Sequence, residues 1–244
     1  MTEPCDPATS TTGAATSAGV PVAVPAAPPA PVTSAAPAAA SVEAPTVRRA
    51  TRRTVQLLGG LVLYSVSIAM LVHAALGSMP WDVLSQGVSR RLGWSFGTAV
   101  LVTSVLVLLA WWPLRQRPGI GTVANVLVIG LLVDPCLAVL DLLPEELPMA
   151  ARIALVAGGI AANGVASGLY IGARLGPGPR DGLMTGLVAR TGWRVGAVRA
   201  SIEVTVVAVG WLLGGTVGFG TLAYALCIGP LIGLLLPRLT VPAR

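Results

Sequence analysis

The apolar part of this chain contains an internal sequence repeat with a spacing of 99 residues. The stretch LGSMPWDVLSQGVSRRLGWSFG begins at Leu76, and LGPGPRDGLMTGLVARTGWRVG begins at Leu175. The same spacing carries Asp82 to Asp181 without a gap. A repeat of this length is too long for a solenoid unit. It is typical of the two halves of a polytopic membrane protein, so the sequence predicts two copies of one helical unit.

Composition supports a membrane protein and excludes several other classes. Hydrophobic residues make up 54% of the chain and charged residues only 11%, whereas soluble domains carry about a quarter charged residues. The net charge is +6, but the arginines lie at the ends of apolar runs, which indicates membrane topology rather than nucleic-acid binding. Cys5, Cys136 and Cys227 are scattered and have no neighbouring histidine. We therefore expect no metal site, no cofactor and no enzymatic nucleophile.

Six apolar runs are long enough to cross a bilayer, which takes about 20 residues. They cover approximately 54–76, 96–113, 119–142, 152–174, 196–214 and 219–237. Placing the arginines of 48–53 in the cytoplasm puts most other arginines there as well, with Arg90 and Arg91 as the exception. The sequence therefore predicts a multi-pass protein of the cytoplasmic membrane whose N- and C-termini both lie in the cytoplasm.

The chain divides into three parts by composition. Residues 1–47 are rich in Pro, Ala, Ser and Thr and are predicted to form a disordered cytoplasmic tail. Residues 48–143 form a first membrane repeat and residues 144–244 a second. Three spans per repeat is an odd number, so the second repeat enters the membrane with the opposite polarity. We expect an all-α fold of six transmembrane helices in two inverted three-helix repeats.

A short motif lies between the first two spans of each repeat. PWDVLSQGVSRRLGWS and PRDGLMTGLVARTGWR each begin with Pro followed by an acidic residue, which is typical of a helix start, and each ends at Gly-Trp. About ten residues cannot cross a bilayer. Each motif is therefore predicted to form a short helix that is either interfacial or re-entrant. Such paired segments in the two halves indicate the site of a transporter.

Six residues in or near these segments are candidates for a solute or proton pathway. Asp82 and Asp181 could carry a proton or a cation, or could only complement a helix N-terminus. Arg180 could pair with Asp181, bind an anion or act as a topology signal, and the last is the interpretation we favour. Glu203 lies inside a span, where an ionisable residue indicates function by default, although pairing with Arg199 would also explain it.

Two further candidates, Asn125 and Tyr170, supply polar groups to the spans and could equally bridge helices.

Three segments carry a resemblance to a known family: LGSMPWDVLSQGVSRRLGWSFGT, RPGIGTVANVLVIGLLVD and ASGLYIGARLGPGPRDGLMTGLVARTG. They resemble the actinobacterial branch of the YczE family of bacterial integral membrane proteins, and are distantly similar to the YitT type. The resemblance covers about residues 50–238. It implies a small protein of the bacterial inner membrane with no assigned substrate, and it supplies no functional residues.

These observations predict a small secondary transporter or permease of unknown solute, with proton coupling as an option. The alternative is a non-transporting accessory or sensory protein that supports a partner complex. The expected partners are the lipid bilayer, a small charged solute and, because six spans are few to enclose a pathway, a second copy of the chain. No nucleic acid is expected to bind.

Overall fold

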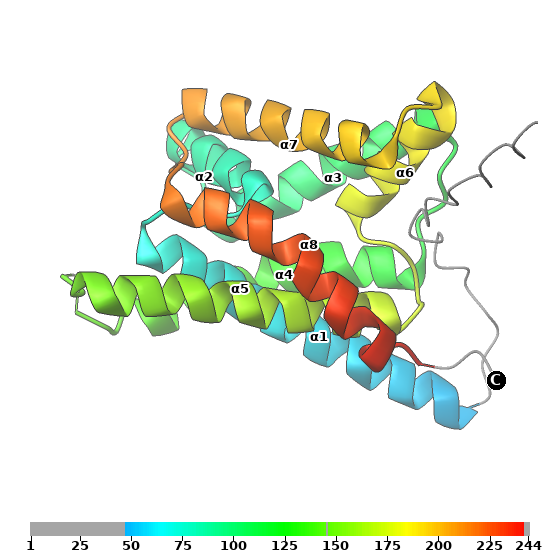
Figure 1. The fold of residues 1–244 in the computed structure, drawn as a ribbon, viewed down its shortest axis with the longest axis horizontal. Helices are drawn as coiled ribbons and strands as arrows, with labels where there is room; N and C mark the ends of the chain where they lie inside the picture. The colour runs from blue at the N-terminus through cyan, green and yellow to red at the C-terminus, as the bar shows by residue number, and fades with distance from the viewer. Residues whose placement is uncertain (1–46, 145, 242–244) are drawn as a thin grey trace, which may run out of the picture. The chain divides into compact units, whose positions relative to one another are not determined.

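A computed structural model describes residues 47–144 and 146–241, and it describes side chains in the first helix from Ala50 onward. Every regular element in these residues is an α-helix (Figure 1). The helices are α1 (Val47–Ala74), α2 (Pro80–Leu92), α3 (Phe96–Leu114), α4 (Ile120–Leu140), α5 (Met149–Gly172), α6 (Pro179–Thr191), α7 (Val195–Leu212) and α8 (Phe219–Leu239). The predicted disordered tail lies almost entirely outside the described residues.

Six of these helices are long and apolar enough to cross a membrane: α1, α3, α4, α5, α7 and α8. Their positions agree with the six runs expected from hydropathy. The main difference is at α1, which already includes Arg52 and Arg53, so the arginine cluster continues the first span as a helix instead of preceding it. The chain is therefore an all-helical protein whose long helices contact the lipid bilayer.

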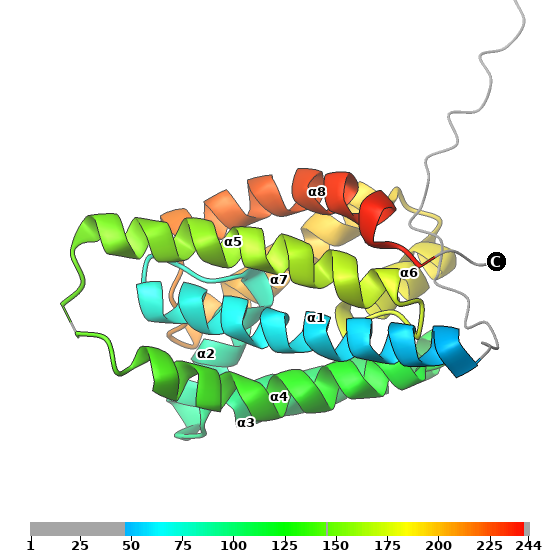
Figure 2. The same ribbon diagram turned by 90° about the horizontal axis from the view of Figure 1, so that it is seen from below.

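Helices α1 and α5 make the most extensive contact between two of the described helices and run antiparallel (Figure 2). Arg152, near the start of α5, donates hydrogen bonds to the carbonyls of Ala74 and Ala75 at the end of α1, at 2.8 and 3.0 Å. At the other end, Gln56 of α1 donates to the carbonyl of Leu169 on α5 at 3.1 Å. Among the described residues, most apolar side chains of the buried core come from these two helices, and α3 and α4 supply others.

Two glycines allow α1 and α5 to approach closely. A Cβ at Gly60 would press against Leu169 and Tyr170 of α5, and a Cβ at Gly159 would press against Leu71 of α1. Small residues at such a crossing let the two backbones pack without lipid between them, which is the usual basis of helix association in a membrane. The α1–α5 contact therefore depends on small residues in the sequence, and α4 and α8 pack on its two sides, α4 on α1 and α8 on α5.

The two short helices α2 and α6 lie toward opposite ends of the bundle (Figure 1). Helix α2 packs chiefly on α7 and helix α6 chiefly on α3. Each is reached through a glycine with positive φ, Gly77 at 110° and Gly176 at 136°. Such a conformation suits only glycine, and it turns the chain back into the bundle after α1 and after α5. Neither short helix could cross a bilayer.

Candidate functional site

The two short helices begin and end in the same way. Pro80 and Pro179 occupy the first helical turn, where the missing N–H costs nothing and the fixed φ favours the helix. Both helices are stopped by a glycine in the left-handed conformation, Gly93 with φ 68° and Gly192 with φ 70°. These features agree with the start and stop signals of the motif, and they aim the N-terminal turn of each helix into the protein.

The two N-terminal turns meet at Arg180. Its guanidinium lies 3.4 Å from Oδ1 of Asp82 and 5.3 Å from the centre of the Trp81 ring. The ion pair of Arg180 is with Asp82, whereas the sequence had suggested Asp181 as its partner. Arg180 crosses from α6 to the first turn of α2, a contact between residues 98 positions apart. Anion binding by Arg180 and its role as a topology signal stay predictions.

Asp82 is fully buried, with an exposed fraction of 0%. Its Oδ1 accepts the bond from Arg180, whereas its Oδ2 has no hydrogen-bond partner among the described residues. Asp82 lies on α2, outside the six spanning helices, and burial raises the pKa of its carboxyl to about 6 although Arg180 opposes the shift. Asp82 does not act as a helix cap in this structure, because its hydrogen bond goes to Arg180.

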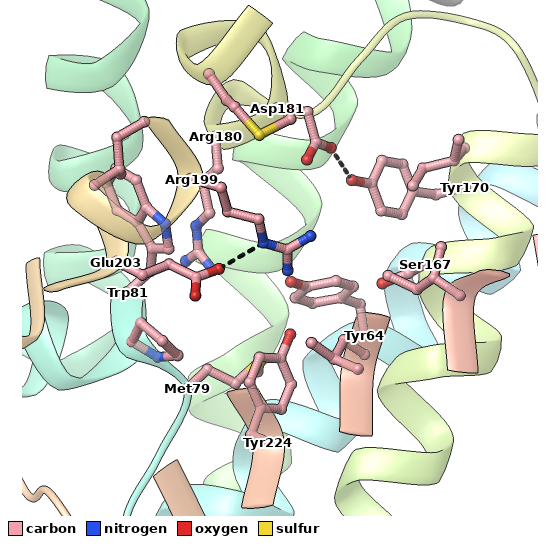
Figure 3. A pocket seen from close by; sticks show the side chains of 16 residues that line it. Tyr64, Met79, Trp81, Ser167, Tyr170, Arg180, Asp181, Arg199, Glu203 and Tyr224 are labelled. Atoms are coloured by element: carbon pink, nitrogen blue, oxygen red, sulfur yellow. Dashed lines mark hydrogen bonds and ion pairs between the residues drawn. The ribbon is translucent and has the colours of Figure 1, made fainter. Parts of the chain in front are cut away.

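A cavity of about 110 Å³ opens beside Arg180, between α7 and α8, and we call it the α7–α8 cavity. Figure 3 shows Arg199 and Glu203 on one side of it and tyrosine rings on the other, with Asp181 beside Tyr170. The chain has only three tyrosines, and all three line this cavity: Tyr64, Tyr170 and Tyr224. Arg199 keeps 45% of its side chain exposed, so the cavity reaches the protein surface.

A second cavity of about 60 Å³ lies on the other side of Arg180, and we call it the α3–α4 cavity. Ser104 of α3 and Asn125 of α4 supply its polar wall. Tyr64, Tyr170, Arg180 and Asp181 line both cavities. The first turn of α6 and two tyrosines therefore separate the two spaces.

The remaining two acidic candidates each have one partner. Asp181 accepts a hydrogen bond of 2.6 Å from the hydroxyl of Tyr170. Glu203 accepts one of 2.9 Å from Arg199, one turn earlier on α7. The predicted pairing of Glu203 with Arg199 is thus present, but both side chains also face the α7–α8 cavity. A structural and a functional role for Glu203 therefore remain compatible.

A buried polar chain supports the tyrosine wall. Asn163 of α5 is fully buried; it donates to Ser67 Oγ at 2.9 Å and accepts from the hydroxyl of Tyr224 at 2.9 Å. Tyr64 packs edge-on against Tyr170 with ring centroids 6.1 Å apart. Buried polar networks of this kind fix side-chain positions when each member is satisfied.

All six residues singled out in the sequence come together around Arg180: Asp82, Asp181, Glu203, Arg180, Asn125 and Tyr170. The sequence interpretation missed Tyr64 and Trp81. The rarity of tyrosine in this chain was the available signal for Tyr64, because three tyrosines inside spans have few other reasons to converge. Among the described residues, no group of three or more His, Cys, Asp or Glu side chains is placed to hold a metal ion.

Comparisons with known proteins agree with the membrane architecture. Residues 51–237 match a family model described as "Family of unknown function (DUF6198)". An uncharacterized protein of Haemophilus influenzae is 36% identical over 176 residues, 72% of this chain and 79% of the relative. The uncharacterized membrane protein YczE of Bacillus subtilis is 30% identical over 181 residues, 73% of this chain and 83% of the relative. No solved structure matches. The chain therefore belongs to this family of YczE-like membrane proteins.

Proposed function

We propose that this protein is a small secondary transporter whose solute pathway passes Arg180. One observation carries the proposal: the N-terminal turns of two short helices from matching positions of the repeat meet between two adjoining cavities. Half-helices that end inside a transmembrane bundle and point their N-termini at one place are typical of transporter sites. A protein built only to support a partner would not need charged groups buried at that place.

The repeats are inverted in this proposal, and reciprocal contacts support it. The amide of Gly121 donates to the carbonyl of Leu175, and the amide of Gly220 donates to the carbonyl of Leu76, both at 2.8 Å. At the 99-residue spacing Gly121 corresponds to Gly220 and Leu76 corresponds to Leu175. The two bonds are therefore equivalent, and each one joins the two repeats in the opposite direction. Since α1 and its counterpart α5 run antiparallel (Figure 2), a two-fold axis relating them lies across the helices, in the membrane plane.

The two cavities then serve as two access routes to one site. Ile129 lines the α3–α4 cavity and its counterpart Ile228 lines the α7–α8 cavity. With inverted halves, equivalent cavities face opposite sides of the membrane. We place both termini in the cytoplasm of a bacterial inner membrane, so the α7–α8 cavity faces inward. The pathway lies within one copy of the chain and does not require the predicted homodimer.

Side-specific labelling tests this proposal without knowledge of the solute. In a variant lacking Cys5, Cys136 and Cys227, single cysteines replace Ile129 or Ile228, and intact and permeabilised cells are treated with small membrane-impermeant methanethiosulfonates. We expect Ile129→Cys to react from outside and Ile228→Cys only after permeabilisation. Leu142→Cys, in the loop before α5 where the side chain is exposed, is the control for the outer side.

Reaction of both cysteines from the same side would mean that the halves are parallel, and it would remove alternating access. The accessory-protein alternative would then be favoured over transport. Reaction of neither cysteine, with Leu142→Cys labelled normally, would show that no aqueous route reaches the site and would also contradict transport.

A further inference from the structure

We propose that the solute is a small organic monocarboxylate, bound by Arg180 together with a proton that is taken up by Asp82. This inference rests on the proposed transporter function and adds the class of solute and the coupling. It depends on three features: the donors that face the cavity, the loose hold on Arg180, and the burial of Asp82.

The donors around the cavity suit a single carboxylate. Arg180 and Arg199 present guanidinium groups, which match a carboxylate with two parallel hydrogen bonds. The first turns of α2 and α6 add the positive ends of two helix dipoles at the same place. The hydroxyl of Tyr64 can donate as well, whereas the hydroxyls of Tyr170 and Tyr224 already donate to Asp181 and Asn163. The acidic neighbours Asp181 and Glu203 make a more highly charged anion unfavourable.

The size and apolar wall of the cavity indicate a small organic molecule. Met184, Ile171 and Ile228 provide part of the lining, so the end of the solute opposite its charge contacts apolar groups. A cavity of roughly 150 Å³ is enough for benzene. The α7–α8 cavity has about 110 Å³ and therefore suits a molecule of a few carbon atoms, such as pyruvate, lactate or propionate.

Arg180 is held loosely enough to change partner. Its hydrogen bond to Asp82 is 3.4 Å long, at the weak end of the range for such bonds, and it uses one of five donors. A quarter of the side chain remains exposed to the cavity. A carboxylate entering the cavity can therefore take the guanidinium that now faces Asp82.

When the guanidinium of Arg180 leaves Asp82 for the solute, the Asp82 carboxylate takes up a proton. Asp82 is fully buried, and a buried charge without a partner is strongly unfavourable. The titratable groups that interact electrostatically with Asp82 are Arg180 on α6, Tyr64 on α1 and Tyr224 on α8, and neither tyrosine supplies a positive charge. The proton adds to Asp82 while the charge of Arg180 is neutralised by the solute, so the site gains no net charge.

Calorimetric titration of the purified full chain with pyruvate tests this proposal. Titrations in two buffers of different ionisation enthalpy count the protons, and we expect uptake of one proton for each pyruvate. Below the pKa of Asp82 the Kd should be nearly constant, and above it the Kd should rise about tenfold per pH unit. Lactate and propionate should bind in the same way.

Three variants separate the roles. Asp82→Asn should still bind pyruvate but should lose both the proton uptake and the pH dependence. Arg180→Lys keeps a positive charge beside Asp82 but lacks the planar fork, so its Kd should rise about tenfold or more. Arg190→Lys, on the exposed end of the same helix where it donates to the carbonyl of Pro113, is the matched control and should bind like the natural protein.

Several results would overturn this inference. Failure of all three carboxylates to bind, or binding of choline or ethanolamine in their place, would contradict the solute class. Binding of pyruvate without proton uptake, or unchanged proton uptake in Asp82→Asn, would contradict the coupling. None of these results would affect the labelling at Ile129 and Ile228, so failure of the solute class and failure of the transporter proposal can be told apart.

Discussion

The α3–α4 and α7–α8 cavities occupy equivalent positions in the repeat but differ in chemistry. Counterparts at the 99-residue spacing are Val100 and Arg199, Ser104 and Glu203, Asn125 and Tyr224, Ile129 and Ile228. The second copy thus carries the charges and an aromatic ring, while the first keeps small polar or apolar groups. Equivalent positions of the two repeats therefore carry different side chains. In the proposed transporter, this difference would mean that the two access routes have different roles.

The helices around the two cavities also differ in how closely they pack. Helix α3 packs on α4, whereas α7 and α8 make no contact of comparable extent among the described residues. A Cβ at Gly97 would overlap Gly130 and Asp134, and Gly97 donates its amide to Asp134 at 2.7 Å. The counterparts Gly196 and Gly229 meet nothing within 4 Å. The structure therefore has a closed α3–α4 side and an open α7–α8 side.

Helix α2 and helix α6 each pack on a long helix of the other repeat, and the sizes of the contacting side chains are reversed between the two contacts. Gly210 of α7 lets the backbone at Val83 and Leu84 of α2 approach closely. At the equivalent contact the sizes are reversed: Gly182 of α6 lies against the ring of Trp111 on α3. Trp111 also donates its indole N–H to the carbonyl of Pro179 at 3.0 Å. In each contact a large residue faces a glycine, but the large residue is on the short helix in one contact and on the long helix in the other. Enlarging the glycine of either contact without a compensating change should therefore destabilise the protein.

The largest effect is therefore expected from Gly182→Ala. Its Cβ would overlap the Trp111 ring, and we expect a loss of about 3 kcal/mol in the free energy of unfolding. Trp111→Ala removes the overlapping ring, so the double variant should be more stable than the sum of the two single changes by at least about 1 kcal/mol. Thermal unfolding in detergent measures both.

Gly229→Ala is the control for that cycle, because a Cβ at Gly229 meets nothing within 4 Å. A cost for Gly182→Ala no greater than that of Gly229→Ala, or simple additivity with Trp111→Ala, would show that the two short helices are not fitted to the opposite repeat by size.

A smaller effect should separate the closed and open sides. Gly97→Ala places a methyl group against Gly130 and Asp134 and should lower the free energy of unfolding by about 1–2 kcal/mol. Gly196→Ala at the equivalent position of α7 has room and should change stability by no more than about 0.5 kcal/mol. Equal effects of the two variants in thermal unfolding would mean that α7 and α8 are packed as closely as α3 and α4.

Much of this architecture could be predicted from hydropathy and the repeat, because long apolar runs and turn residues act locally. The six spans and the short helices at 80–92 and 179–191 follow from such signals. The contact of Arg180 with Asp82 could not be predicted, since it depends on where two helix starts meet in space. Tyr64 was missed for a related reason: the rarity of tyrosine in the chain marks it as unusual, but its convergence with Tyr170 and Tyr224 depends on how the helices pack.

The smallest change in stability is expected at Glu203, the sharpest difference between the two cavities. Glu203→Gln removes an ion pair with Arg199, 2.9 Å long and partly exposed at both ends. Such a pair on one helix contributes about 0.3–0.5 kcal/mol, so the unfolding temperature should hardly move. Pyruvate uptake into proteoliposomes should nevertheless fall sharply, because Arg199 loses the carboxylate that positions it in the cavity. Uptake that stays normal would mean that Glu203 only holds α7 together, and that the chemical difference between the two cavities has no part in transport.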